Sequence, residues 1–190
     1  MTPPYYNKTS KEGLAAHFLH IADNVDIPII LYNVPSRTSI GIDFDTYRTL
    51  ARHPNINGTK EASNNLPLIA KILCCLNDQL FVWSGNDDNV LALMSMGAKG
   101  LISVVSNVIP ASVSQICHLC LDGQYSTALE IFRKYYGLCE GLFVDVNPIP
   151  VKSAMKMLGM DRGQLRLPLT ELDENKSDKL KSVLINAGLL

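Results

Sequence analysis

The residues best suited to chemistry in this chain are a lysine, a tyrosine and an arginine. Tyr32 ends an apolar run of strand length, and Arg37 follows it in the turn Asn-Val-Pro-Ser-Arg. Lys60 lies in Gly-Thr-Lys-Glu, which also has the pattern of a strand. Lysines are uncommon in strands covered on both faces, because burying an ammonium group is costly unless its pKa falls or it gains a partner. A buried lysine near a tyrosine indicates an amine nucleophile.

The chemistry of an amine nucleophile constrains the surroundings of Lys60. An amine attacks a ketone only in its neutral form, so the pKa of ~10.4 that is ordinary for lysine must fall, and an apolar interior lowers it by desolvation. Strand alternation places Lys60 on the same side as Ile56 and Gly58, which leave it room to react. Tyr32, at the end of an adjacent strand, can pass protons to the reacting atoms. Arg37 suits a carboxylate, because a guanidinium group donates two parallel hydrogen bonds.

Each of these residues also has a simpler structural interpretation. From its tetrapeptide alone, Lys60 reads as a strand-end residue in solvent that pairs with Glu61. Tyr32 alone is more often a core or rim aromatic residue, and Arg37 alone is more often a surface charge. Only the companion motifs described below reverse that preference.

Three further motifs favour structural roles over metal or redox chemistry. Cys117 and Cys120 have the spacing of a redox or zinc pair, but no second pair accompanies them, so helix packing is the better interpretation. His17 and His20 lie three residues apart without an evident third ligand, which favours a solvated helix face. The Ser-Gly-Asn-Asp-Asp segment at 84–88 is explained by a helix-capping turn. We expect no metal site.

Composition places the chain among soluble globular proteins. Of its 190 residues, 47% are hydrophobic and 18% are charged, and the formal net charge is −1. The sequence has no basic stripe, no signal peptide and no apolar run long enough to span a bilayer, so we expect no nucleic-acid or membrane partner. Its five cysteines are an odd number scattered over helix-like segments, which is typical of reduced thiols in a cytoplasmic protein.

Apolar runs alternate with amphipathic segments along the chain. We expect strands at 27–33, 55–60, 80–84 and 100–105. We expect helices at 9–24, 43–53, 64–77, 88–96, 110–121, 124–139, 148–158 and 176–187. The first helix has the form of a capping box in Thr9-Ser10-Lys11-Glu12. Four strands that are each followed by a helix predict parallel βα units.

The predicted fold class is α/β, with parallel βα units that form the carboxyl-terminal part of a (βα)8 barrel. Polar or glycine-rich residues follow the carboxyl end of each predicted strand, where such barrels place their active sites. A complete barrel needs about 250 residues, and only about four strands are evident here. We therefore expect an incomplete barrel at 1–122, followed by a carboxyl-terminal helical region at 123–190.

Several motifs of the chain, taken together and in order, resemble a known family. They are Pro-Tyr-Tyr-Asn at 4–7, Tyr-Asn-Val-Pro-Ser-Arg-Thr at 32–38, Gly-Thr-Lys-Glu-Ala at 58–62, Ser-Gly at 84–85 and Asn-Pro-Ile-Pro-Val-Lys at 147–152. They resemble dihydrodipicolinate synthase, a (βα)8-barrel aldolase of the pyruvate-dependent lyase superfamily that includes N-acetylneuraminate lyase. The resemblance runs the whole length of the chain and matches only the later part of the family's sequence.

The resemblance implies a role for each matching residue. The implied catalytic residues are Lys60, which would form a Schiff base with pyruvate, Tyr32, which would relay protons, and Tyr6, which this family contributes across a dimer interface. Tyr5 resembles the neighbour of that tyrosine near a lysine-inhibitor cleft. The implied substrate-binding residues are Arg37, for the carboxylate of aspartate semialdehyde, and Gly85 and Ile102, for pyruvate. No cofactor is implied beyond the covalent pyruvate imine on Lys60.

Three functions remain open from the sequence. The first is a lyase that condenses pyruvate with aspartate 4-semialdehyde in lysine and diaminopimelate biosynthesis. The family's Gly-Thr-Thr-Gly-Glu segment has no counterpart in this sequence, so its activity would be impaired to the extent that it needs that segment. The second is another pyruvate aldolase, such as N-acetylneuraminate lyase. The third is a catalytically inactive fragment that acts only in assembly. We also expect self-association, because an incomplete barrel leaves open sheet edges and exposed apolar surface. Asn57 and Thr59 lie on the side of their strand that should face the helices. Because both are polar, we expect this side to be weakly buried.

Overall fold

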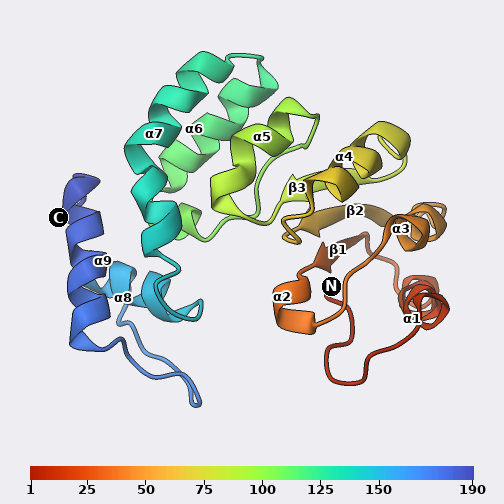
Figure 1. Ribbon diagram of the computed structural model, residues 1–190, viewed down its shortest axis with the longest axis horizontal. Helices are drawn as coiled ribbons and strands as arrows, with labels where there is room; N and C mark the ends of the chain where they lie inside the picture. The colour runs from red at the N-terminus through yellow and green to blue at the C-terminus, as the bar shows by residue number, and fades with distance from the viewer. The chain divides into compact units, whose positions relative to one another are not determined.

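The computed structural model describes residues 1–190, which form two compact units, Met1–Ile102 and Ser103–Leu190 (Figure 1). Each unit is described by itself. The sequence places the end of the barrel portion at residue 122, and that boundary remains a prediction.

The first unit is built on a three-stranded parallel sheet in the order β1-β2-β3. Its strands are β1 (Ile29–Asn33), β2 (Ile56–Glu61) and β3 (Phe81–Ser84). Its helices are α1 (Lys11–Asp23), α2 (Pro35–Thr38), α3 (Phe44–Leu50), α4 (Leu66–Cys75), the 3₁₀ turn η1 (Asp87–Asn89) and α5 (Val90–Ser95). A helix follows each strand, which confirms the predicted α/β fold of parallel βα units.

Short polar side chains begin three of these helices. The Asp43 carboxylate accepts a hydrogen bond from the backbone N–H of Thr46 at the start of α3, and the Asn65 side chain accepts one at the start of α4. At α1 the capping residue is Ser10, whose hydroxyl accepts from the backbone N–H of Gly13 at 3.1 Å. The predicted helix is confirmed, but the predicted capping box, which would cap with Thr9, is wrong by one residue.

The fourth predicted strand, at 100–105, does not form. Leu101 makes a single isolated bridge to Ser84, and the chain then enters a 3₁₀ turn, η2 (Val105–Asn107). The hydroxyl of Ser103 accepts a hydrogen bond from the backbone N–H of Ser106 at 2.7 Å. Short hydroxyl side chains offer the backbone such local partners in place of a ladder. The strand prediction is therefore wrong beyond Leu101.

A short helix that the sequence did not predict follows β1. Pro35 stands at the start of α2, where its fixed φ suits the first helical turn, and Ser39 ends the helix with a φ of 59°. The hydroxyl of Thr38 donates to the carbonyl oxygen of Ile40 at 2.7 Å and stabilises the exit from the helix. Arg37 consequently lies in the last turn of a helix, not in an irregular turn.

One face of the sheet, which we call the outer face, is buried. Leu31, Thr59 and Val82 have no exposed surface. Tyr47 on α3 is also fully buried, and its hydroxyl lies 2.9 Å from the Thr59 hydroxyl. The prediction of weak burial at this side of β2 is wrong for Thr59, because a helix supplies a hydrogen-bond partner that the strand sequence cannot reveal. Asn57 is exposed.

The opposite face, which we call the inner face, carries Ile30 and Tyr32 from β1, Gly58 and Lys60 from β2, and Phe81 and Trp83 from β3. Ile30 is 37% exposed and Phe81 is 44% exposed. A Cβ atom on Gly58 would lie 2.4 Å from the Trp83 ring. The ring therefore crosses directly over Gly58, and a larger residue there would displace it.

The second unit is helical. It contains η2 and four α-helices, α6 (Pro110–Leu121), α7 (Tyr125–Gly141), α8 (Ile149–Met157) and α9 (Glu174–Asn186). Gly141 permits close packing of α7 on α9, because a Cβ atom there would lie 2.8 Å from a methyl group of Val183. Leu138 of α7 and Leu180 and Leu184 of α9 are buried.

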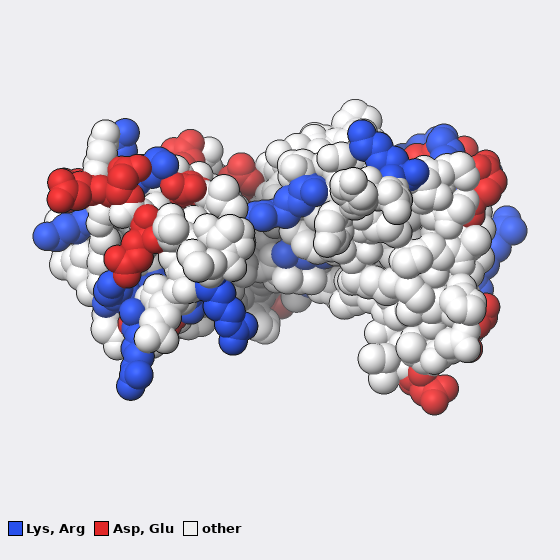
Figure 2. All heavy atoms as spheres, turned by 90° about the horizontal axis from the view of Figure 1, so that it is seen from below, with Lys and Arg blue, Asp and Glu red and all other residues white.

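The surface charges are mixed in sign. Lys and Arg side chains are interspersed with Asp and Glu on the face shown in Figure 2, in keeping with the formal net charge of −1. None of the helices has the length and apolar character needed to cross a membrane.

Candidate active site

The inner face brings Lys60 and Tyr32 together at the carboxyl end of the sheet. Tyr32 is the register partner of Lys60 in the neighbouring strand, and Trp83 is its partner on the other side. The Lys60 amine lies 4.4 Å from the centroid of the Tyr32 ring. Both side chains are half-buried. A cation over an aromatic face is attracted by the ring quadrupole, and in its neutral form the same amine stands beside the phenol.

Burial lowers the pKa of the Lys60 amine below its ordinary value. The negative charge of Asp87 opposes this shift, and the positive charge of Arg37 adds to it. Burial also raises the pKa of the Tyr32 phenol, while Arg37 acts in the opposite direction. The site therefore holds a larger share of neutral amine than an exposed lysine would, beside a phenol that keeps its proton.

Arg37 is exposed and extends from α2, next to the end of β1. Its positive charge lowers the pKa of both Lys60 and Tyr32, so the three side chains suggested by the sequence lie close enough to interact electrostatically. The simpler interpretation, an ion pair between Lys60 and Glu61, is not what the structure shows. Glu61 is 1% exposed and hydrogen-bonds with Asn33, Tyr47 and Ser63 on the outer face.

Gly85 and Ile102 line the same carboxyl edge beside β3. The backbone N–H of Gly85 donates to the Glu61 carbonyl oxygen at 2.6 Å, and the N–H of Ile102 donates to the Ser84 carbonyl oxygen at 2.9 Å. A Cβ atom on Gly85 would lie 2.8 Å from the Cβ of Ala62. Glycine at this position therefore lets the ends of β2 and β3 approach each other. Ile102 is 38% exposed.

Tyr6 is not brought to the Lys60–Tyr32 pair. Its side chain is 87% exposed and that of Tyr5 is 72% exposed, in the loop before α1. The structure of a single chain therefore leaves the role implied for Tyr6 as a proposal.

Two groups near the pair escaped the sequence reasoning. Trp83 has the same strand parity as Phe81, and alternation along Phe-Val-Trp-Ser could have placed it on the inner face. Asp87 is buried in η1, and its charge acts on Lys60. Within the sequence it was part of a segment interpreted only as a capping turn, so its relation to Lys60 had no local signal.

The other motifs lie on helices: Cys117 and Cys120 in α6, and His17 and His20 in α1. No group of three or more His, Cys, Asp or Glu side chains is arranged to hold a metal ion. None of the five cysteines forms a disulfide, and Cys120 is buried in α6.

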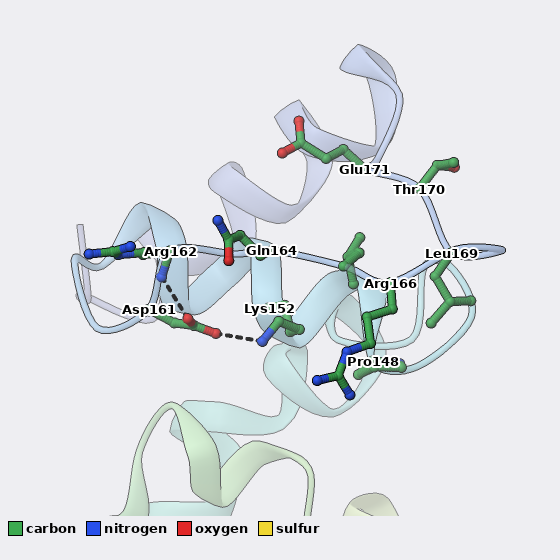
Figure 3. Close-up of a pocket in the computed structure, with 10 residues that line it drawn as sticks. Pro148, Lys152, Asp161, Arg162, Gln164, Arg166, Leu169, Thr170 and Glu171 are labelled. Atoms are coloured by element: carbon green, nitrogen blue, oxygen red, sulfur yellow. Dashed lines mark hydrogen bonds and ion pairs between the residues drawn. The ribbon is translucent and has the colours of Figure 1, made fainter.

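A hollow of about 1020 Å³ lies within the second unit, between α8 and the segment that precedes α9 (Figure 3). The Lys152 amine is paired with the Asp161 carboxylate at 2.8 Å, and the backbone N–H of Arg162 donates to the same carboxylate. Arg166, Thr170 and Glu171 also line it. None of the residues suggested by the sequence as catalytic or substrate-binding belongs to this hollow.

Comparison with known proteins identifies the family of the chain. The model of the dihydrodipicolinate synthetase family matches residues 1–187. The chain belongs to this family. It is 46% identical over 188 residues to the 4-hydroxy-tetrahydrodipicolinate synthase of Thermoanaerobacter sp. (strain X514), and the match covers 98% of this chain and 63% of the relative. The corresponding synthase of Methanococcus maripaludis (strain C6) is 45% identical, with 98% and 64% covered.

Solved structures of the family match the fold closely. Dihydrodipicolinate synthase from Aquifex aeolicus superposes with a TM-score of 0.96 at 43% identity, covering 99% of this chain and 64% of the other. The chloride-inhibited enzyme from Acinetobacter baumannii, solved in complex with pyruvate, gives a TM-score of 0.96 at 39% identity, with 100% and 65% covered. The predicted family and fold class are thereby confirmed. The chain spans less than two thirds of the length of these relatives.

Proposed function

We propose that this chain carries the Schiff-base chemistry of 4-hydroxy-tetrahydrodipicolinate synthase, with Lys60 as the nucleophile toward pyruvate. The observation that carries the proposal is the half-buried Lys60 amine, 4.4 Å from the Tyr32 ring centroid, at the carboxyl end of a parallel sheet. Desolvation lowers the pKa of this amine and so favours the neutral, nucleophilic form.

In the proposed reaction the Lys60 nitrogen attacks the keto carbon of pyruvate, forming a C–N bond while the carbonyl electrons move to oxygen. The Tyr32 phenol, whose pKa is raised by burial, supplies the proton that this oxygen needs and recovers one as the nitrogen loses its own. The hydroxyl then leaves as water with a proton from the Tyr32 phenol, which gives the protonated imine and a phenolate. The phenolate takes a proton from the methyl group of the bound pyruvate, and the resulting enamine carbon attacks the aldehyde carbon of aspartate 4-semialdehyde, whose oxygen takes the proton back from Tyr32.

The remaining residues have binding roles in this proposal. Arg37 receives the carboxylate of the aldehyde substrate, because its guanidinium group is exposed and its charge reaches both Tyr32 and Lys60. Gly85 and Ile102 border the pyruvate pocket at the edge of β3. Tyr6, exposed in its own chain, acts in a partner copy after self-association.

Reductive trapping tests the nucleophile directly. The chain is incubated with pyruvate and borohydride, and modified peptides are identified by mass spectrometry, with Lys60→Ala as the control. We expect the reduced pyruvate adduct on Lys60 and its loss in the variant. An unmodified Lys60 in the wild-type chain would contradict the proposal.

Two further functions are alternatives to this proposal. Exposed Ile30 and Phe81 on the inner face favour an alternative in which the chain acts only in assembly, without catalytic turnover. A superfamily aldolase such as N-acetylneuraminate lyase would use the same imine with a sugar aldehyde. Arg37 favours a short carboxylated aldehyde, and assaying product formation from both aldehydes distinguishes the three cases.

A further inference from the structure

A buried carboxylate lies directly behind the Lys60–Tyr32 pair, on the outer face of the sheet. Glu61 is 1% exposed. One of its oxygens accepts hydrogen bonds from the Asn33 amide at 2.9 Å and from the Tyr47 hydroxyl at 2.6 Å. The other accepts from the Ser63 hydroxyl at 2.7 Å. An ionised carboxylate only accepts hydrogen bonds, so all three partners act as donors.

The network extends from Glu61 into three neighbouring segments. Because the Tyr47 hydroxyl donates to Glu61, the Thr59 hydroxyl at 2.9 Å is the donor to Tyr47. The Asn33 carbonyl oxygen of the side chain accepts from the backbone N–H of Ile42 at 3.0 Å. Glu61 thereby connects the ends of β1 and β2 with α3 and with the segment that follows α2. No buried side-chain polar atom in the chain lacks a hydrogen-bond partner.

The register of the sheet relates this network to the reactive pair. Asn33 and Glu61 are register partners and are the last residues of β1 and β2. Tyr32 and Lys60 form the register pair immediately before them. Successive side chains of a strand point to opposite faces, so fixing one pair on the outer face also fixes the backbone from which the other pair leaves. A slip or twist of either strand end would separate the amine from the phenol.

Charges other than that of Glu61 shift the pKa values of this pair. The charged groups that shift the pKa of Lys60 are Asp87 in η1 and Arg37 in α2, and Arg37 alone shifts that of Tyr32. Burial raises the pKa of the Glu61 carboxyl, against the hydrogen bonds from Tyr47, Ser63 and Asn33. Ionising Glu61 therefore costs the folded state free energy, whereas an apolar residue would fill the same space without that cost.

We propose that Glu61 is a positioning residue: from the outer face its carboxylate holds the ends of β1 and β2 together and so keeps Lys60 beside Tyr32 on the inner face. This inference rests on the proposed role of Lys60 as nucleophile. Its consequence is that loosening the network hydrates Lys60 and reduces the share of neutral amine, even though Glu61 itself touches no substrate.

The test compares Glu61→Leu, which leaves the donors without an acceptor, with Glu61→Gln, whose amide oxygen still accepts from Asn33 and Tyr47. Leu14→Ala is the matched control, because Leu14 is a buried residue of α1 that takes no part in the network. For each protein, the rate of borohydride-trapped pyruvate adduct at Lys60 is measured against pH. The pKa of Lys60 is measured separately by NMR of the protein dimethylated with ¹³C-formaldehyde, with Lys60→Ala identifying the signal.

In Glu61→Leu we expect the midpoint of the pH profile and the pKa of Lys60 to rise by roughly one unit, with adduct formation at neutral pH about tenfold slower. Glu61→Gln should stay within about threefold of the wild type. Leu14→Ala should lower the unfolding midpoint without moving the pH profile. If Glu61→Leu does not fold, Tyr47→Phe removes one donor while keeping the ring, and it should give a smaller shift in the same direction.

Three results would overturn the role of Glu61: an unchanged profile in Glu61→Leu, an equal shift in Leu14→Ala, or equal losses in Glu61→Gln and Glu61→Leu. If wild-type Lys60 takes no pyruvate, the proposed function fails, and the NMR titration still decides about Glu61. A pKa of Lys60 that rises in Glu61→Leu alone supports the positioning role, and one that is equal in all variants refutes it.

Discussion

The neutral form of Lys60 is obtained at the expense of stability. Its pKa in the folded chain lies below the unfolded value because of burial. Between these two pKa values the unfolded state binds more protons, so the free energy of unfolding rises as the pH rises through the folded pKa. At neutral pH the charged Lys60 side chain therefore destabilises the folded chain. This destabilisation comes from the same burial that favours the neutral, reactive amine.

Replacing Lys60 with methionine should consequently stabilise the chain at neutral pH. We expect the Lys60→Met variant to unfold roughly 1–3 °C higher than the wild type at pH 7. The difference should shrink as the pH approaches the ordinary pKa of lysine, because the wild-type amine is then neutral as well. Thermal unfolding followed by circular dichroism between pH 7 and 10 measures this. Lys8→Met, at an exposed position, is the control and should show no such trend; a gain in Lys60→Met that is independent of pH would contradict the explanation.

Tyr32 offers both an aromatic face and a proton, and Tyr32→Phe separates them. The ring beside Lys60 is retained, so the local packing should persist, but the phenol proton is lost. Proton transfer by a positioned side chain contributes about 10²–10⁴-fold in rate. We expect trapping of the pyruvate adduct to slow by about 10²-fold or more. Tyr136→Phe in α7, where the ring packs on Phe132, is the matched control; trapping at the wild-type rate in Tyr32→Phe would exclude the proton relay.

At the level of elements, the approach of β2 and β3 depends on Gly85. A Cβ atom there would lie 2.8 Å from the Cβ of Ala62 and 2.9 Å from the Glu61 carbonyl oxygen, so the strand ends would have to separate. We expect Gly85→Ala to lower the free energy of unfolding by about 1–3 kcal/mol and to slow trapping at Lys60. Gly137→Ala, in the middle of α7 with no atom within 4 Å of its Cβ, should instead stabilise by about 0.5–1 kcal/mol. Urea unfolding of both variants tests the contrast, and similar effects would refute it.

Helices and strands that are marked by neighbouring residues could be predicted from the sequence. Those that depend on contacts with other parts of the chain could not. The apolar run ending at Asn33 and the proline that opens α6 marked their elements correctly. Val104 and Val105 suggested a strand, but Ser103 bonds the local backbone and the chain turns away after Leu101. Local composition cannot report that competition.

The same distinction applies to the site. The residues Lys60 and Tyr32 could be selected from the sequence because their neighbouring motifs are distinctive. Their pairing depends on the register of β1 and β2, which the structure supplies. The burial of Thr59 depends on Tyr47, which belongs to a different element. Thr59 therefore appeared as a weak point in the sequence, although in the structure it belongs to the network behind the site.

On the scale of the whole first unit, the inner face remains open on one side. Ile30 is 37% exposed and Phe81 is 44% exposed, Trp83 is half-buried, and Ile102 beside β3 is 38% exposed. The edge of β1 is better protected than the sequence suggested. The amino group of Met1 donates to the Ile30 carbonyl oxygen at 2.7 Å, and the Tyr32 N–H donates to the Met1 carbonyl oxygen at the same distance. Exposed apolar surface, more than open backbone groups, is thus the reason to expect association.

Self-association should therefore depend on the inner face. We expect light scattering coupled to size exclusion to give a dimer or larger species for the wild-type chain, and Phe81→Glu to reduce the mass toward that of a monomer. A charge at this position would have to be buried without a partner when the face is covered. Leu121→Glu is the control, because Leu121 is 59% exposed at the end of α6 and lies outside the inner face. A monomeric wild type, or equal dissociation by both variants, would show that the inner face does not drive association, and Tyr6 would then have no partner copy in which to act.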